Sequence, residues 1–522
     1  MDEKLPHPKL YYAAATGFGA LLPLGFAPFG FSLLPILSLI GLLAIWQKAN
    51  RRQSLLSGWF FGIGLYAVGA SWIFISIYVY GATPLPFAII LTALFVLIMG
   101  FITAIQGYFF HLLGLNKMAL LGFPALWIVF EWVKTWLFTG FPWLYLGYAM
   151  MDTPVEGFVP ITGIFGVSFI TAFGAALCFI LLQQIVQPSP RLKWAALSTV
   201  FYFTAIPVTG SFLLETAWTE KTSETPLSVS IIQGNIAQET KWDLNFRDAI
   251  LNLYQERTEA IWGSDLIIWP EAAVPAFEHE VSDYLNTINQ RAQDQGSSLI
   301  MGLAIMHYLS DGDFLFYNSI RSMGQGSGLY HKQRLVPFGE FVPFEDQLRG
   351  LTGAFNLPMS SFTRGDANQA PLLAGKHSIY PYICYEILFP DLVARTSQHA
   401  EILVTISNDG WFGRSAGPAQ HFEMARMRAL ETGRYLIRAT NNGISAIVDP
   451  KGRVTHLAPS FVETTLNGEV YAMQGNTPFM DWGSRPILIL AALILLSFVV
   501  LSIKQKILRD PALQTEQEPD PR

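Results

Sequence analysis

Long runs of apolar residues dominate the first 213 residues of the chain, and one more run lies near its C-terminus. A helix of about 20 apolar residues spans the roughly 30 Å hydrocarbon core of a bilayer. Glycine and proline occur inside several of these runs, which membrane helices tolerate better than soluble helices do. We predict eight transmembrane helices, at 10–30, 33–47, 55–79, 84–113, 118–138, 158–186, 194–213 and 486–503. The second run is short, so seven spans is the alternative.

Residues 216–483 follow a different pattern. Short runs rich in β-branched and aromatic residues alternate there with segments of helical periodicity, at 245–261, 279–295 and 417–433. Such alternation is typical of a layered α/β or α+β domain. The strand-like runs are LSVSIIQGNI, DLIIWPE, SLIMGLAIM, FYNSIRSM, GLYHKQRLVP, SIYPYICYE, AEILVTISND, RYLIRATNN and GISAIVDP.

The basic residues that flank the apolar runs indicate how the chain is oriented. Cytoplasmic loops of membrane proteins carry an excess of Lys and Arg. With eight spans every basic cluster falls on one side, whereas the opposite loops 80–84 and 139–157 carry no Lys or Arg. We therefore expect both termini in the cytoplasm and residues 216–483 outside it. The clusters are Lys4 and Lys9; Lys48, Arg51 and Arg52; Lys117; Arg191 and Lys193; and Lys504, Lys506 and Arg509.

This topology divides the chain into four parts. They are 1–215 with helices one to seven, an extracytoplasmic domain at 216–483, helix eight at 484–505 and a cytoplasmic tail at 506–522. A cleaved signal peptide within 1–27 is the alternative for the N-terminus, because Lys4 and Lys9 precede an apolar stretch. Its removal would upset the charge alternation. Residues 510–522 are polar, and we expect them to be disordered.

Composition narrows the class of protein. The chain is 51% hydrophobic and only 14% charged, with a mean hydropathy of +0.35. An ordinary soluble domain is about 25% charged, so a membrane protein carrying one water-soluble part is indicated. That part holds 19 Lys and Arg against 29 Asp and Glu in residues 216–483. A net charge of −6 gives no electrostatic footprint for nucleic acid, so that class of partner is excluded.

The chain has two cysteines, Cys178 and Cys384. Cys178 lies in a predicted membrane helix and Cys384 follows a strand-like run outside the membrane, so we expect no disulfide between them. No CxxC or HExxH spacing occurs. The sequence therefore predicts neither a metal site nor a cofactor.

Polar residues with complementary chemistry follow three of the strand-like runs. Glu271 ends DLIIWPE, Lys332 lies in GLYHKQRLVP, and Cys384 lies in SIYPYICYE. Each has a plain structural alternative, since a carboxylate or ammonium at a strand end is commonly solvated and a free cysteine is commonly buried and inert. Together they form a base, a cation and a nucleophile. A carboxylate at Glu386, so close to the thiol, could also raise the thiol pKa, and the sequence leaves this sign open.

The flanking motifs resemble those of a known family. WPE, KxxLVPFGEFVP and CYE…FPD, in that order, are similar to the motifs around the Glu–Lys–Cys triad of the nitrilase superfamily. With SNDGWFG, QHFEMARMRALETGR, TNNGISAIVDPKG and the apolar N-terminal half, nearly the whole chain resembles the apolipoprotein N-acyltransferase family. The resemblance implies an αββα sandwich at 216–483. It also implies catalytic roles for Glu271, Lys332 and Cys384, supporting roles for Glu340, Tyr385 and Glu386, and a substrate-binding role for Trp242.

The resemblance also implies a function. The expected reaction moves an acyl chain from a phospholipid, phosphatidylethanolamine, through a thioester on Cys384. The expected acceptor is the N-terminal amine of a diacylglyceryl-cysteine on a bacterial apolipoprotein. The expected location is the inner membrane, with the catalytic domain on its periplasmic side. Two rivals stay open at this point: a membrane-tethered amidase or nitrilase-type hydrolase, and a transporter or receptor whose outer domain only binds a ligand.

Two further features have no settled role in the sequence. Glu131 and Lys134 lie three residues apart in a predicted membrane helix, so they face the same side and are candidates to pair. A headgroup contact and a simple ion pair both fit them. The aromatic stretches GWFG and LVPFGEFVPF fit either a lid over an acyl chain or core packing.

Overall fold

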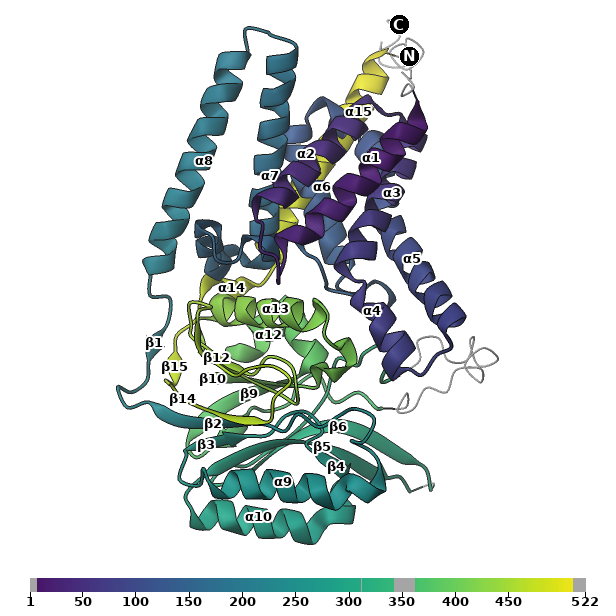
Figure 1. Ribbon diagram of the computed structural model, residues 1–522. Helices are drawn as coiled ribbons and strands as arrows, with labels where there is room; N and C mark the ends of the chain where they lie inside the picture. The colour runs from purple at the N-terminus through teal and green to yellow at the C-terminus, as the bar shows by residue number, and fades with distance from the viewer. Residues whose placement is uncertain (1–6, 311, 342–361, 510–522) are drawn as a thin grey trace, which may run out of the picture.

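The computed structural model describes residues 7–310, 312–341 and 362–509, without the side chains of 502–503 and 505–509. Its apolar helices form a bundle at one end, and two β-sheets with their helices form the other end (Figure 1). Helix α1 begins and helix α15 ends at the same end of the bundle, far from the sheets (Figure 1). Of the predicted segments, 1–6 and most of the 506–522 tail lie outside the described residues.

The bundle is built from apolar helices of unequal length. They are α1 (Pro8–Leu21), α2 (Leu33–Lys48), α3 (Arg51–Gly69), α4 (Trp72–Ile75), α5 (Leu85–Leu112), α6 (Ala119–Val133), α7 (Val159–Val186), α8 (Leu192–Glu215) and α15 (Arg485–Arg509). Three stretches are long and apolar enough to cross a membrane: 85–112, 154–186 and 192–215. A fourth is the bent pair 51–69 and 72–80, while 33–48, 119–133 and 485–501 are shorter apolar helices. Length and composition thus support three or four spanning helices.

Three of the predicted helices are interrupted or end early, and the one expected at 10–30 ends at Leu21, before a 3-10 turn at Leu22–Gly25. The segment expected to be one helix at 55–79 bends by 57° after α3 and continues as α4 and a short π-helix, Ser76–Tyr80. Gly69 and Ser71 lie at the break, and glycine–serine pairs are a common cause of sharp kinks. A Cβ on Gly69 would lie 2.6 Å from a methyl group of Leu144, so a larger residue there would require this side chain to shift. The helix expected at 118–138 ends at Val133, and Phe138 has a φ of 51°.

The two sheets have the topology of a layered domain. In spatial order, the first contains β14 (Thr464–Val470), β2 (Leu227–Gln233), β3 (Leu266–Ile268), β5 (Ser298–Tyr308), β6 (Phe314–Gly324) and β7 (Leu329–His331), with β4 (Val274–Phe277) beside β5. The second contains β13 (Val454–Leu457), β12 (Ala446–Val448), β11 (Leu436–Thr440), β10 (Ile402–Ser407), β9 (His377–Ile383) and β8 (Leu372–Ala374). The short strands β1 (Glu220–Lys221) and β15 (Met473–Gln474) pair separately.

Side chains on opposite faces of the first sheet belong to two separate hydrophobic cores. In β3, Ile268 belongs to the core that includes the second sheet, whereas Ile267 belongs to the core under α9 (Arg247–Glu259) and α10 (Ser282–Asp294). Successive side chains of a strand point to opposite faces, so one strand serves both cores. Helices α9 and α10 cover the outer face of the first sheet, and α12 (Pro390–Ser397) and α13 (Gly417–Thr432) cover the second (Figure 1). The layer order is therefore helix, sheet, sheet, helix.

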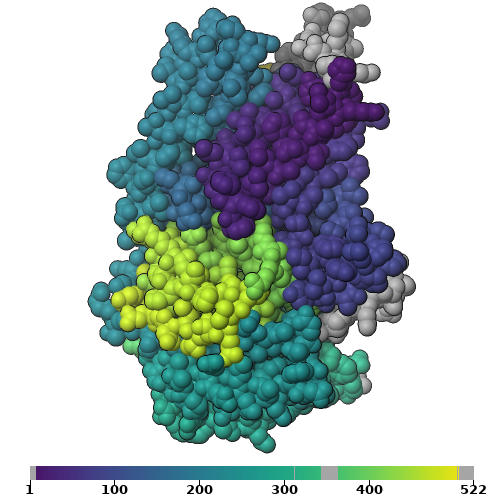
Figure 2. All heavy atoms as spheres, viewed as in Figure 1, coloured from purple at the N-terminus to yellow at the C-terminus, as the bar shows by residue number. Residues whose placement is uncertain are grey.

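Helix α13 joins the sandwich to the bundle. Gln420 on α13 accepts hydrogen bonds at Oε1 from the indoles of Trp72 and Trp143, at 3.3 and 2.7 Å, and donates to the carbonyl of Gly69 at 3.1 Å. Glu423 Oε2 accepts from the backbone N–H of Ala27 at 3.1 Å. Figure 2 shows the two parts packed directly against each other on the face in view. A buried polar helix is thus fastened to the membrane helices by specific bonds.

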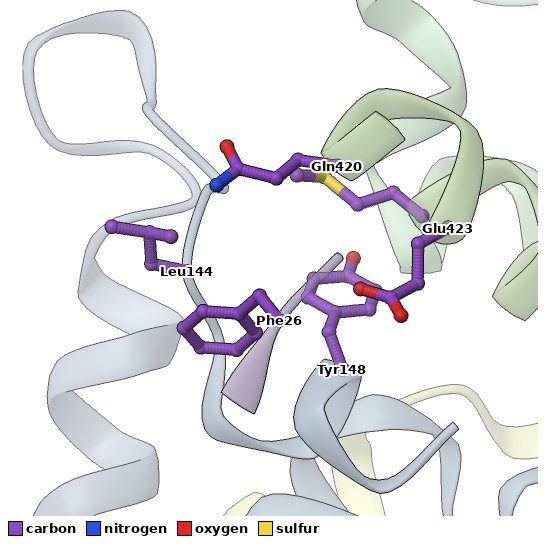
Figure 3. Close-up of a pocket in the computed structure, with 6 residues that line it drawn as sticks. Phe26, Leu144, Tyr148, Gln420 and Glu423 are labelled. Atoms are coloured by element: carbon purple, nitrogen blue, oxygen red, sulfur yellow. The ribbon is translucent and has the colours of Figure 1, made fainter. Parts of the chain in front are cut away.

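A small pocket lies at this junction. Gln420 and Glu423 project into it from α13, opposite Phe26, Leu144 and Tyr148 of the bundle (Figure 3). Its lining includes none of the candidate catalytic residues. It belongs to the interface, and the chemistry must be sought elsewhere.

Candidate active site

Three strands end at the polar residues that the sequence singles out. Glu271 lies just beyond β3, Lys332 follows β7, and Cys384 follows β9. Strands β3 and β5 are parallel, and β7 is related to β5 through two antiparallel pairings, so β3 and β7 run the same way. Equivalent strand ends therefore bring Glu271 and Lys332 to one edge of the first sheet.

Lys332 lies between two carboxylates. Its Nζ is 2.7 Å from Oε1 of Glu340 and 3.6 Å from Oε1 of Glu271, and its side chain is 1% exposed. Burial alone lowers the pKa of Lys332, but the charges of Glu340 and Glu271 outweigh burial and raise that pKa above its ordinary value. Lys332 is therefore a fixed cation. Of the two carboxylates, Glu340 makes the closer contact with this cation.

Glu271 is oriented by residues that the sequence did not single out. Asn318 Nδ2 donates to Oε1 of Glu271 at 2.8 Å and to Oε1 of Glu340 at 2.9 Å. The backbone N–H of Asn408 donates to Oε2 of Glu271 at 2.9 Å. Lys241 Nζ donates to the main-chain carbonyl of Glu271 at 2.9 Å, and burial lowers the pKa of this lysine to about 8. Both carboxylate oxygens and the backbone of Glu271 are thus held in place.

Cys384 is half-buried, and its backbone is left-handed, with a φ of 51°. Burial, together with the charge of Glu271 and against the opposing charge of Lys332, raises the pKa of its thiol to about 12. The thiol is therefore protonated in the resting protein at neutral pH. A reaction at Cys384 requires a base, and Glu271 is the carboxylate that acts on it most strongly.

The pH dependence of alkylation tests this state of the thiol. Only the thiolate reacts with iodoacetamide, so the rate at Cys384 should rise roughly tenfold per pH unit, without a plateau, between about pH 6 and pH 9. Peptide mass spectrometry after timed labelling measures this rate separately from that of Cys178. A plateau near neutral pH would mean that the thiolate is already formed at rest, which would contradict the protonated thiol.

Glu386 holds the backbone on both sides of the candidate site. Its Oε1 accepts from the hydroxyl of Tyr330 at 3.0 Å and from the backbone N–H groups of Gln333 and Arg334 at 2.6 and 3.1 Å. Its Oε2 accepts from the N–H of Ile383 at 2.8 Å. Burial raises the pKa of Glu386 to about 7, and these backbone bonds oppose the rise. Glu386 therefore joins the segment after Lys332 to the turn that carries Cys384.

Tyr385 connects the same turn to the helix bundle. Its hydroxyl donates to the carbonyl of Gly140 at 2.8 Å, and its side chain is buried. Gly140 belongs to the TGFPW stretch between α6 and α7. The residue next to Cys384 is thus hydrogen-bonded to a loop of the membrane part.

Removing this hydroxyl should affect Cys384 as well as stability. Tyr385→Phe is expected to lower the free energy of unfolding by about 1 kcal/mol and to change the alkylation rate of Cys384. Tyr284→Phe is a matched control, because its hydroxyl donates to the carbonyl of Leu251 at 2.9 Å. The control should lose similar stability and leave the rate unchanged. Equal alkylation rates in both variants would show that the bond to Gly140 does not position the turn.

The remaining predicted residues lie around this centre. Trp242 is half-buried in the turn after β2, directly beside Lys241. In the GWFG stretch, the ring of Phe412 packs 4.7 Å from Trp72 and 6.0 Å from Trp143, between centroids, which favours packing for this residue. LVPFGEFVPF is described only as far as Phe341, and its last three residues lie outside the described ranges.

Glu131 and Lys134 do not form the ion pair that their spacing suggests, since the ion pairs of the described residues do not include them. Glu131 Oε1 instead accepts from the backbone N–H of Leu146 at 2.6 Å, and Lys134 Nζ donates to the carbonyl of Trp143 at 3.3 Å. The two side chains hold the loop after α6, and that loop carries the Tyr385 contact at Gly140.

A buried cation, a held carboxylate and a protonated thiol at neighbouring strand ends suit nucleophilic acyl transfer. Glu271 can take the thiol proton, and Lys332 can stabilise negative charge on an oxyanion. Within the described ranges, no group of three or more His, Cys, Asp or Glu side chains is arranged to hold a metal ion.

Comparison with known proteins assigns both halves of the chain. The family model described as the apolipoprotein N-acyltransferase N-terminal domain matches residues 18–177. The model described as carbon-nitrogen hydrolase matches residues 228–475. Apolipoprotein N-acyltransferase of Pseudomonas paraeruginosa is 42% identical over 92% of this chain and 94% of its own length. Those of Azotobacter vinelandii and Coxiella burnetii are 43% and 36% identical, again over 92% of this chain and over 93% and 98% of their own lengths.

The resemblance seen in the motifs is thus confirmed by identity over nearly the full length, in both the apolar part and the sandwich. Because these relatives match the apolar part as well as the sandwich, the similarity is not confined to the sandwich. The chain belongs to the apolipoprotein N-acyltransferase family.

Proposed function

We propose that this protein transfers an acyl chain from a phospholipid to the N-terminal amine of the diacylglyceryl-cysteine of bacterial apolipoproteins, with Glu271, Lys332 and Cys384 as its catalytic residues. The observation that supports this proposal most strongly is the match to relatives named for this activity. They match 92% of the chain, including both the sandwich and the membrane part. The geometry supports the residue roles, because Lys332 lies between two carboxylates. The charges of Glu271 and Lys332 also both shift the pKa of the Cys384 thiol.

The first half-reaction loads the enzyme. Cys384 Sγ attacks the ester carbonyl carbon of the phospholipid while Glu271 takes the thiol proton. Lys332 stabilises the oxyanion of the tetrahedral intermediate, a contribution of roughly 3–4 kcal/mol for one such donor. The C–O bond then breaks, and Glu271 returns the proton to the departing oxygen. The products are a thioester on Cys384 and a lysophospholipid.

The second half-reaction transfers the chain. The α-amine of the acceptor attacks the thioester carbonyl and passes one proton to Glu271. The C–S bond breaks, and Glu271 delivers that proton to the departing sulfur, which restores the thiol. An amide forms on the acceptor with no net change in the enzyme. Since the lysophospholipid leaves before the acceptor reacts, ping-pong kinetics are expected.

The supporting residues have distinct proposed parts in this scheme. Glu340 holds Lys332 through their 2.7 Å contact, Glu386 fixes the backbone near the nucleophile, and Tyr385 ties that turn to the bundle. Trp242, half-buried in the turn beside Lys241, is proposed to contact substrate.

The membrane arrangement is part of the proposal. Eight spans would place 1–215 and 484–505 in the bilayer, 216–483 on the periplasmic side of the inner membrane and 506–522 in the cytoplasm. This is supported by the positions of α1 and α15, whose outer ends lie together away from the sheets (Figure 1). The charge pattern of the sequence also supports eight spans, because with that number every basic cluster falls on one side of the membrane. A catalytic domain tethered at both ends suits two substrates that are both anchored in lipid.

One assay tests the function against its nearest rival. The protein would be incubated with phosphatidylethanolamine labelled in its acyl chains and with a diacylglyceryl-cysteine peptide. The acyltransferase predicts label in an amide at the peptide N-terminus and none with an N-acetylated peptide. Release of free labelled fatty acid with no label in the peptide would instead support a tethered amidase or nitrilase-type hydrolase. A receptor or transporter would give neither product.

A further inference from the structure

The backbone turn at Cys384 has an uncommon conformation, and the residues of the proposed mechanism do not account for every contact that holds it. Cys384 has a φ of 51°, in the left-handed region that side chains other than glycine seldom adopt. Such a conformation persists where its surroundings hold it. Glu386 holds the residue before the turn, through the N–H of Ile383. The carbonyl of Cys384 itself is held from elsewhere, by Nε2 of His421 at 3.1 Å.

His421 is part of a buried polar cluster. Its Nδ1 lies 3.1 Å from Oδ1 of Asp409 and 3.1 Å from NH2 of Arg438. Arg438 NH2 also donates to Oδ2 of Asp409 at 2.8 Å, and the hydroxyl of Ser407 donates to Oδ1 at 2.7 Å. The side chains of His421, Asp409 and Arg438 are at most 1% exposed. Three residues from three different elements thus fix one imidazole ring.

The bonding partners determine how the ring is protonated. A carbonyl oxygen only accepts, so Nε2 of His421 must carry the hydrogen that it donates to Cys384. In the neutral ring Nδ1 then accepts, and the guanidinium of Arg438 supplies a donor. Burial lowers the pKa of His421 and the charge of Arg438 lowers it further, which agrees with a neutral ring. Arg438, whose guanidinium faces Nδ1 and is held by Asp409, therefore favours the ring form that can hold the carbonyl of Cys384.

The same helix connects this ring to the bundle. His421 follows Gln420, whose side chain is bonded to Trp72, Trp143 and Gly69. The ring centroid of Trp143 lies 6.0 Å from that of His421. One turn of α13 therefore contacts the membrane helices on one side and the nucleophile's carbonyl on the other.

We propose that His421, fixed by Asp409 and Arg438, is a positioning residue that holds the Cys384 carbonyl, and so aims the thiol, from the helix that docks on the membrane part. The ring touches no substrate in this account and transfers no proton. The proposal rests on the proposed function only in so far as it concerns acylation of Cys384.

Two amide substitutions separate a positioning role from a packing role. His421→Gln places an N–H donor near the position of Nε2, whereas His421→Asn is shorter and places it near Nδ1. Single-turnover acylation of Cys384 by phosphatidylethanolamine should stay within a few-fold of wild type in His421→Gln. In His421→Asn it should fall by about 10–100-fold with KM for the phospholipid unchanged, because a misplacement of about 1 Å can cost about 100-fold.

A second readout does not depend on acyl transfer. If the turn loosens in His421→Asn, the thiol becomes more exposed, and its iodoacetamide profile should move toward that of an ordinary thiol near pH 8.5. The His421→Gln profile should match wild type. Thermal unfolding of both variants is measured alongside, since both lose the same ring packing.

The outcomes are distinct. Equal acylation and equal alkylation profiles in the two variants would overturn the positioning role. If wild type forms no acyl adduct at all, the proposed function fails, and the alkylation profiles alone still decide whether His421 holds the turn.

Discussion

Replacing Cys384 with alanine is expected to abolish acyl transfer, with no product above the rate without enzyme. The thiol is the only nucleophile in the scheme, and alanine leaves Glu271 and Lys332 without a group to activate. The fold should persist, because Cys384 is half-buried and its side chain is small. Transfer of labelled acyl chain to a diacylglyceryl-cysteine peptide measures the loss, and thermal unfolding of the purified protein checks the fold.

The second cysteine provides the matched control. Cys178 lies on α7 and is also a free, partly buried thiol. Cys178→Ala should transfer at the wild-type rate and should retain labelling at Cys384. Residual transfer by Cys384→Ala at a substantial fraction of the wild-type rate would require a different nucleophile.

Replacing Lys332 with methionine should damage both stability and chemistry. The ammonium lies 2.7 Å from Glu340 and 3.6 Å from Glu271, and its removal leaves two neighbouring carboxylates without their cation. Breaking a buried pair by removing one partner typically costs about 3–5 kcal/mol. The loss of oxyanion stabilisation should slow acylation by a further ~100–1,000-fold. Chemical denaturation and single-turnover acylation measure the two effects separately.

A surface lysine shows what loss of charge alone does. Lys451 Nζ lies 3.5 Å from Glu215, and its side chain is 34% exposed. Exposed pairs contribute about 0–1 kcal/mol, so Lys451→Met should have little effect on either measurement. If Lys332→Met were as stable and as active as Lys451→Met, the central place given to Lys332 would be wrong.

The order of strands and helices in the sandwich could be predicted from the sequence, because the residue types and the hydrophobic periodicity of each segment indicate the same element. Runs of β-branched residues that end at polar residues became β2, β3, β5, β6, β7, β9, β10, β11 and β12, and the predicted helices became α9, α10 and α13. Strands β4 and β8 were not predicted, because their sequences, VPAF and LLA, are not runs of β-branched residues. The break after Gly69 was also missed, because the apolar run continues through it without a change in composition.

The residues that orient the site were harder to predict because none has a pattern of its own. Asn318 lies inside a strand-like run, and His421 and Arg438 lie within a helix and a strand. Their roles depend on contacts with residues tens to hundreds of positions away, as for Lys241 with Glu271. Glu131 and Lys134 show the converse, since a suggestive spacing led to two separate bonds with a loop. Motifs pointed to the groups that we propose react, and only the packed structure showed what holds them.

The most direct test of the account is the mass of the peptide that contains Cys384. The protein would be incubated with phosphatidylethanolamine in the absence of acceptor, digested, and analysed with and without hydroxylamine, which cleaves thioesters. We predict one acyl chain on the Cys384 peptide, removed by hydroxylamine and by addition of the diacylglyceryl-cysteine peptide. An unmodified Cys384 peptide, from protein that still transfers acyl chains when acceptor is added, would contradict the thioester and with it the proposed mechanism.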